Sequence, residues 1–287
     1  MQEMNRDTMQ RGQGDGLVLS HSANGLRDLV PLRQNGTKPD RPPVPSPEVR
    51  IAHLYPDLLN LYGDRGNIIC LQKRCQWRGI KATVKEYSLD DEVRLDEADI
   101  LFLGGGSDRE QRIVAGRLLE SRDDIHAYVE DDGVLVAICG GYQLIGHYYQ
   151  LDGERIEGLA LVDAYTVAGP TRLIGNVVLQ GATEGLRTKI VGFENHAGRT
   201  HIGAHTPLGT VVHGFGNNGE DGTEGILYKN VVGTYLHGPV FPKNPALADL
   251  VIEKALTRRY GGHIALPPLD DGLEDAAHAY IVNRFPA

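Results

Sequence analysis

The chain has 287 residues, of which 41% are apolar, enough to fill the core of one large domain. Its 38 acidic and 29 basic residues give a formal net charge of −9, which argues against a nucleic-acid-binding surface. No apolar run approaches the ~20 residues of a membrane-spanning helix, and three cysteines are too few for a secreted disulfide framework. We therefore expect a globular protein of the cytoplasm.

The first 48 residues differ from the rest of the chain. They contain all three methionines and six of the fifteen prolines, and they show no sustained apolar period. A Pro-rich, weakly apolar segment cannot bury enough surface to offset the entropy that is lost on ordering it. We expect residues 1–48 to be a disordered extension and residues 49–287 to form one folded domain.

From Val49 onward, apolar runs alternate with amphipathic stretches. Strands are expected at 49–54, 80–87, 99–103 and 134–138, and helices at 67–78, 107–129 and 140–149. Ser107 is a suitable N-cap for the longest of these helices. Such alternation predicts an α/β fold, with a mostly parallel sheet and helices on both of its faces.

The second half of the chain has a different character. Residues 159–236 are rich in glycine and contain short β-branched segments, at 173–179, 189–193 and 231–236. We expect this part to be a mixed or antiparallel extension of the same sheet. Two further helices are expected to close the chain, at 245–259 and 273–284.

The most informative turn follows the fourth expected strand. Cys139 stands there before Gly140 and Gly141, where a tight turn lifts a nucleophile above the sheet and a helix N-terminus favours a thiolate. The N–H of Gly140 is placed to donate to an oxyanion. A second donor is expected from Gly105 or Gly106, because loops that follow adjacent parallel strands converge. The alternative is a buried structural cysteine.

A histidine stands at the end of another apolar strand. The segment 231–236 is followed by His237, where a general base could reach a nucleophile on a neighbouring strand. Alone, His237 is equally compatible with a strand-end histidine that is satisfied by the backbone. Together, Cys139 and His237 favour nucleophilic catalysis.

These motifs resemble a known family. The segments 139–143 (CGGYQ) and 235–238 (YLHG) are similar to the class I glutamine amidotransferases of the cobyric-acid-synthase (CobB/CobQ) type. Four longer motifs resemble, within that family, the glutaminase subunits of lipid II isoglutaminyl synthase (the GatD type); they lie at 54–67, 171–175, 193–200 and 214–219. The resemblance runs from about Ile51 to the last helices.

The resemblance implies a three-layer α/β domain at 49–287 that hydrolyses glutamine. Cys139 would attack the side-chain amide to give a thioester, and His237 would act as its acid and base. By family position, Arg172 would hold the α-carboxylate of glutamine, and Gln143 would line the same pocket.

The sequence departs from the wider family in one important respect. Many relatives carry a glutamate two residues after the histidine, where this chain has Pro239. The carboxylate that orients the imidazole of His237 must therefore be absent, come from elsewhere in the chain, or come from a partner. A smaller departure is Ala137, which replaces a glycine two residues before the nucleophile.

The chain contains no G-x-x-x-x-G-K-[ST] loop with which to bind ATP phosphates. We therefore expect no cofactor here. The resemblance implies a heterodimer with a Mur-ligase-like synthetase of the MurT type, which would hold ATP and Mg and would amidate the D-glutamate of lipid II. The alternatives are a stand-alone amidotransferase for corrinoid amidation and a catalytically silent scaffold subunit.

Two suggestive patterns are set aside. The segment 214–219 (GFGNNG) spells a dinucleotide-binding fingerprint, but no clear long strand precedes it and no helix is expected to follow it, so a loop near the partner or the acceptor is the preferred interpretation. His196, His201 and His205 lack the spacing of a recognised zinc site, so no metal site is expected.

Overall fold

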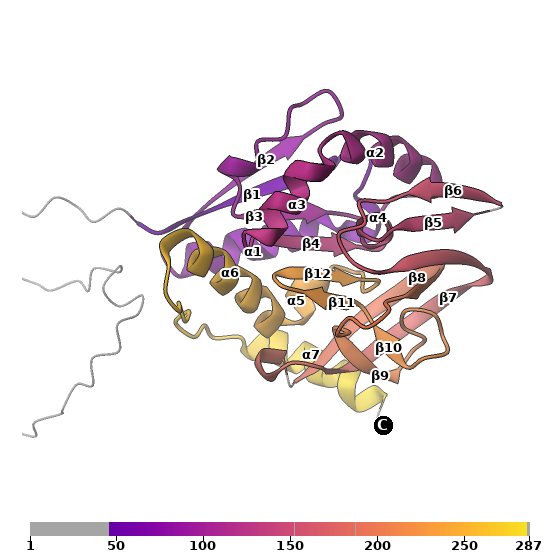
Figure 1. Cartoon of the computed structure of the whole chain (residues 1–287). Helices are drawn as coiled ribbons and strands as arrows, with labels where there is room; N and C mark the ends of the chain where they lie inside the picture. Colours follow the sequence, from indigo (N-terminus) through magenta and orange to yellow (C-terminus); the bar gives the residue numbers. More distant parts are fainter. Residues whose placement is uncertain (1–45, 152, 187, 286–287) are drawn as a thin grey trace, which may run out of the picture.

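The computed structural model describes residues 46–151, 153–186 and 188–285 (Figure 1). Most of the expected disordered extension, residues 1–45, lies outside the described residues. The first strand begins at Glu48, one residue before the start expected from the sequence.

The first sheet has six strands in the order β11-β12-β4-β3-β1-β2, and all of its pairs are parallel except β11 with β12. Its two central strands, β3 and β4, are buried at every residue, which explains their uninterrupted apolar sequences. The strands are β1 (Glu48–Leu54), β2 (Lys81–Tyr87), β3 (Ile100–Leu103), β4 (Val134–Ile138), β11 (Ile226–Tyr228) and β12 (Val231–Thr234).

Helices cover both faces of this sheet, which confirms the predicted fold class. The crossovers β1–α1–β2 and β3–α2–α3–β4 run in opposite directions along the sheet, so right-handed connections place α1 and α2 on opposite faces. α5 and α6 pack beside α1, and α4 packs beside α2. The helices of these layers are α1 (Arg65–Trp77), α2 (Asp108–Glu120), α3 (Arg122–Glu130), α4 (Gly140–Ile145), α5 (Val240–Lys243) and α6 (Pro245–Tyr260).

Two helix predictions need correction. The single helix expected over 107–129 is broken at Ser121, whose φ of −104° and ψ of 17° end α2 and start α3. The N-cap is confirmed, since Ser107 and Glu110 form a capping box. The helix expected over 140–149 ends at Ile145, because Gly146 has extended dihedral angles and the chain turns into a strand.

The middle of the chain forms a second sheet rather than an extension of the first, so that prediction is wrong. Its order is β10-β9-β7-β5-β6, and β8 pairs along the length of β7. Only β11 and β12 return to the first sheet (Figure 1). The strands are β5 (Tyr148–Leu151), β6 (Glu154–Glu157), β7 (Tyr165–Gly181), β8 (Lys189–His201), β9 (Gly209–His213) and β10 (Thr223–Glu224).

The last helix, α7 (Gly272–Arg284), contains no buried residue and is held at its start by a buried arginine. The guanidinium of Arg74 in α1 donates to Asp249 in α6 at 2.6 and 2.7 Å, and to Asp271 at 2.6 and 2.8 Å. Because this guanidinium is 2% exposed, its loss would remove the charged partner of Asp271, whereas Asp249 would keep the guanidinium of Arg78, which donates to it at 2.6 and 3.1 Å. Three short 3₁₀ turns complete the structure, η2 (Leu61–Gly63), η3 (Leu95–Glu97) and η4 (Glu184–Leu186).

No helix in the described part of the chain is both long and apolar enough to cross a membrane.

One buried side chain makes stability depend on pH. His53 of β1 is 0% exposed, and neither ring nitrogen meets a hydrogen-bond partner among the described residues. Burial lowers the pKa of His53 below its usual 6.5. The folded state therefore favours the neutral ring of His53. The free energy of unfolding has its full value above pH ~6.5, and it falls as the pH drops from there toward the pKa of the folded state.

We predict that His53→Leu changes the free energy of unfolding by less than about 1 kcal/mol at pH 7.5, because the replaced group makes no hydrogen bond. Below pH 6.5 the wild type should lose up to about 1.4 kcal/mol per pH unit that the variant keeps. Urea unfolding at pH 7.5 and 5.5 measures this. The exposed His263→Gln is the control, and parallel pH dependence in wild type and His53→Leu would contradict the prediction.

Candidate active site

The site lies at the carboxyl edge of the first sheet, where four neighbouring strands end. β12 leads into His237, β4 into Cys139, and β3 into the Gly104–Gly106 loop. The loop after β1 supplies Asp64. Because neighbouring parallel strands end at the same edge of the sheet, these groups lie close together although they are distant in the sequence.

Cys139 occupies a strained turn between β4 and α4. Its φ of 50° and ψ of −103° are unfavourable for a residue with a Cβ, and such strain is characteristic of a nucleophile elbow. Its backbone N–H donates to the carbonyl of Thr234 at 2.8 Å, which ties the turn to β12. A Cβ on Gly141 would lie 2.5 Å from the carbonyl oxygen of Leu103, so the turn needs glycine there. Cys139 is 7% exposed.

His237 faces this thiol from the adjacent strand. Its backbone is fixed to Phe193 of β8 by two hydrogen bonds, of 2.8 and 3.3 Å, and its ring lies within hydrogen-bonding reach of Cys139. A Cβ on Gly105 would lie 3.2 Å from both the Cβ of Cys139 and the Cε1 of His237, which shows how closely the three residues pack. The structure thus brings together the two residues expected to form the catalytic pair.

Asp64 is the member of the site that the sequence analysis did not single out. It is 0% exposed, and its Oδ1 lies 3.9 Å from the Nδ1 of His237. Its Oδ2 accepts a hydrogen bond of 2.6 Å from the N–H of Gly105. Asp64 thus occupies the place of the orienting carboxylate that Pro239 cannot supply. The available signal was an acidic residue in a loop that follows a strand ending at the same edge.

The electrostatic environment favours the protonated ring of His237. Burial acts to lower the pKa of this imidazole, but the negative charge of Cys139 and the carboxylate of Asp64 outweigh burial and raise the pKa to about 10. An imidazolium next to a thiolate is a nucleophile with a proton donor already in place.

The three glycines that were expected to supply oxyanion donors differ in whether their N–H groups already have an acceptor in the protein. The N–H of Gly105 is bonded to Asp64 and so is not available to a substrate, which corrects the proposal for that residue. The N–H of Gly106 meets no acceptor within the described residues. Gly140 is the first residue of α4, so its N–H has no intrahelical acceptor. Gln111 steadies this loop by donating to the carbonyl of Gly106 at 3.2 Å.

Arg172 lies on β7 of the second sheet and is exposed. Its Nε donates to the Oδ1 of Asn195 at 2.7 Å, and its Nη2 donates to the carbonyl of Asn195 at 2.6 Å. Burial, Asp108 and Cys139 raise the pKa of the Tyr149 phenol, and Arg172 acts against this rise.

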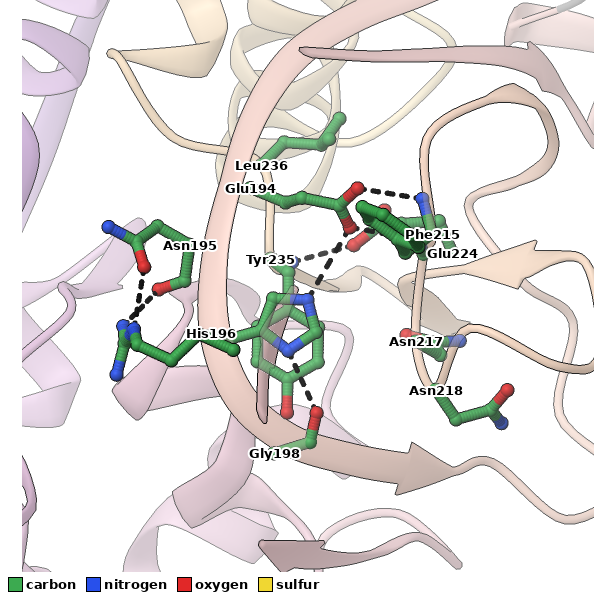
Figure 2. A network of polar contacts seen from close by, with 12 residues as sticks. Glu194, Asn195, His196, Gly198, Phe215, Asn217, Asn218, Glu224, Tyr235 and Leu236 are labelled. Carbon is green, nitrogen blue, oxygen red and sulfur yellow. Dashed lines mark hydrogen bonds and ion pairs between the residues drawn. The ribbon is translucent and has the colours of Figure 1, made fainter. Parts of the chain in front are cut away.

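Gln143 points into the protein interior rather than toward Arg172. It is 4% exposed, and its Nε2 donates to the hydroxyl of Tyr235 at 3.1 Å. Tyr235 stacks face to face on His196, with ring centroids 3.5 Å apart (Figure 2). Gln143 thus bonds to the residue that follows β12, and Tyr235 in turn contacts β8 of the second sheet through His196. The expected contact of Gln143 with glutamine stays a prediction.

Two buried carboxylates anchor the segments behind the site. Glu194 accepts from the backbone N–H groups of Phe215 and Gly216 at 2.7 and 2.9 Å (Figure 2). Burial, together with the charge of Glu194, raises the pKa of Glu224 to about 8, against the opposing hydrogen bonds from Tyr235 and Thr234. Two amide groups of the glycine-rich 214–219 segment are therefore engaged by a carboxylate of the protein rather than turned toward a phosphate.

The histidines set aside as a zinc site make other contacts. The Nδ1 of His196 bonds to the carbonyl of Gly198 at 2.8 Å, and its Nε2 lies 3.5 Å from Glu194. In the described part of the chain, no group of three or more His, Cys, Asp or Glu side chains could hold a metal ion.

A family model for the CobB/CobQ-like glutamine amidotransferase domain matches residues 50–245. The chain belongs to this glutamine amidotransferase family. It is therefore a glutamine-hydrolysing amidotransferase.

The amidotransferase is similar to two curated proteins along most of its length. Both are named "Lipid II isoglutaminyl synthase (glutamine-hydrolyzing) subunit GatD". The protein from Staphylococcus aureus (strain N315) is 44% identical over 238 residues, 83% of this chain and 96% of that protein. The protein from Streptococcus pneumoniae (strain ATCC BAA-255 / R6) is 43% identical over 237 residues, 81% and 90% of the two chains.

A more distant relative covers less of both chains. The "Probable cobyric acid synthase" of Methanothermobacter thermautotrophicus (strain ATCC 29096 / DSM 1053 / JCM 10044 / NBRC 100330 / Delta H) is 31% identical over 172 residues. The match spans 53% of the amidotransferase and 34% of that protein.

We predict that Asp64→Asn moves the alkaline limb of kcat/KM for glutamine to lower pH by about one unit. The carboxylate favours the protonated ring of His237, so its removal lets the ring lose its proton sooner as the pH rises. The side-chain oxygen of asparagine can still accept a hydrogen bond from the N–H of Gly105, so the loop should keep its conformation. The pH profile of glutamine hydrolysis measures the shift.

The matched control is Asp57→Asn, an exposed carboxylate in the same loop. It should leave the profile in place. An unchanged alkaline limb in Asp64→Asn would mean that Asp64 does not act on His237.

Proposed function

We propose that the chain is the glutaminase subunit of a lipid II isoglutaminyl synthase. The observation that carries the proposal is a cysteine in a strained elbow within reach of an imidazolium, in a chain that matches two GatD subunits over most of its length. The reaction of this subunit is the hydrolysis of L-glutamine to glutamate and ammonia.

The first half of the reaction forms a thioester. The Cys139 thiolate adds to the side-chain amide carbon of glutamine, and the N–H groups of Gly140 and Gly106 receive the negative oxygen. His237 gives its proton to the amide nitrogen, the C–N bond breaks, and ammonia leaves. Arg172 holds the α-carboxylate throughout, which suits a guanidinium with two parallel donors.

The second half releases glutamate. Neutral His237 takes a proton from a water molecule, whose oxygen attacks the thioester carbon. The C–S bond then breaks, and the thiolate and imidazolium are restored. Asp64 orients the ring of His237 in both halves and favours its charged form.

The ammonia requires an activated acceptor. We propose that a Mur-ligase-like partner of the MurT type holds ATP and Mg, activates the D-glutamate carboxylate of the lipid II stem peptide, and converts it to D-isoglutamine. The full-length similarity to the two GatD subunits supports this proposal over corrinoid amidation, because the cobyric acid synthase aligns over only about a third of its own length.

Cys139→Ala should lower glutamine hydrolysis by the purified protein and its partner at least about a thousandfold, and His237→Ala about a hundredfold or more. A glutamine-analogue electrophile should label wild-type Cys139, located by mass spectrometry. Cys70 is the internal control, because burial raises the pKa of its thiol to about 12 and keeps it protonated. Hydrolysis that survives in Cys139→Ala would exclude the mechanism, and a wild type that hydrolyses no glutamine with its partner would favour a silent scaffold.

Co-purification tests the partner. A Mur-ligase-like chain that co-purifies and couples glutamine hydrolysis to lipid II amidation supports the proposal. Amidation of cobyrinate by the same preparation would instead support the corrinoid alternative.

A further inference from the structure

The strand that carries Arg172 is interrupted at that residue. β7 and β8 pair in register except between Ala168, which faces Gly198, and Leu173, which faces His196. The four residues 169–172 therefore lie opposite one residue of β8. Such bulges occur next to active sites, where they turn a side chain away from its regular direction.

A second arginine spans this interruption from the other strand. The Nη1 of Arg199 donates to the carbonyl of Ala197 at 2.8 Å, and its Nη2 donates to the carbonyl of Thr171 at 2.9 Å. These carbonyls lie where the ladder is broken, so Arg199 supplies donors in place of the missing strand partners. A planar guanidinium can donate to both strands at once from different nitrogen atoms, whereas an ammonium donates from a single nitrogen atom.

The bulge also closes tightly around this guanidinium. A Cβ on Gly169 would lie 2.5 Å from the Cζ of Arg199, so a side chain there would displace this guanidinium. The segment continues through Pro170, whose ring fixes φ and whose nitrogen needs no acceptor. The shape of the bulge is thus set by Arg199 on one side and by Gly169-Pro170 on the other.

Arg172 makes the reciprocal contact. Its guanidinium crosses from β7 to β8 and bonds to the side chain and the carbonyl of Asn195. These two bonds use two of the five N–H donors of the group, so the others can meet a carboxylate. Each strand therefore accepts hydrogen bonds from an arginine of the other strand.

We propose that Arg199 is the positioning residue for glutamine recognition: it fixes the bulge that aims Arg172 at the α-carboxylate. The inference rests on the proposed hydrolysis of glutamine and on the role of Arg172 in it. Arg199 itself does not touch the substrate. A purely structural arginine would satisfy the same carbonyls but would have no selective effect on the substrate's carboxylate.

The test compares two substrates in the complex of the full chain with its partner. L-Glutamine carries the α-carboxylate, and L-glutaminamide replaces it with an uncharged amide. Arg172→Ala should raise KM for glutamine and abolish the preference for glutamine over the amide. Arg199→Lys should raise KM for glutamine about tenfold, leave its kcat within about twofold, and change kcat/KM for the amide by less than about twofold.

Two controls separate positioning from damage to the fold. Arg155→Lys, an exposed arginine of the same sheet, should leave both substrates unaffected. Iodoacetamide has no α-carboxylate for Arg172 to bind. The rate at which it alkylates Cys139 should therefore be unchanged in Arg199→Lys.

Equal losses on both substrates, a wild-type KM in Arg199→Lys, or a parallel fall in alkylation would each overturn the positioning role. A wild type that hydrolyses neither substrate would instead overturn the proposed function, and this inference with it. The two failures are therefore distinguishable.

Discussion

The site depends on one buried carboxylate with two contacts. Asp64 accepts the N–H of Gly105 at 2.6 Å with one oxygen and faces the Nδ1 of His237 at 3.9 Å with the other. It thereby joins the loop after β1 to the loop after β3 and to the end of β12. A carboxylate removed from water is costly unless its charge is compensated, and here a backbone donor and an imidazolium supply that compensation. The same two contacts fix the position of the glycine loop and favour the charged form of the base.

The two sheets carry different residues of the candidate site. The first sheet is regular and fully buried at its centre, and it holds Cys139 and His237 at fixed strand ends. The second sheet is irregular where it holds Arg172, the residue proposed to bind the α-carboxylate of glutamine. Both parts meet at His237, whose backbone pairs with Phe193 of β8. Displacement of the second sheet would therefore disturb the base as well as the recognition of glutamine.

The sequence was sufficient for features that depend on local pattern. Buried parallel strands, the elbow at Cys139 and the strand end at His237 each follow from a short run of residues. Asp64 could not be found in this way, because its contact depends on how a ten-residue loop (55–64) folds back over the sheet. The role expected for Gly105 was wrong for the same reason, since the partner of a backbone amide is a tertiary property. The second sheet was misjudged because β-branched, glycine-rich segments indicate strands but not which sheet they join.

The proton affinity of His237 follows from its neighbours and must change during the reaction. The charge of Cys139 contributes most to raising the pKa of the ring, ahead of Asp64, while burial opposes both. In the proposed mechanism the thiolate becomes a thioester, so its charge disappears, and the balance shifts toward burial and the neutral ring. The imidazolium that protonates the leaving nitrogen thus becomes a base when a water molecule has to be activated. Under this proposal a single histidine serves both halves because the covalent state of the cysteine shifts the pKa of the ring, with Asp64 limiting how far that pKa falls.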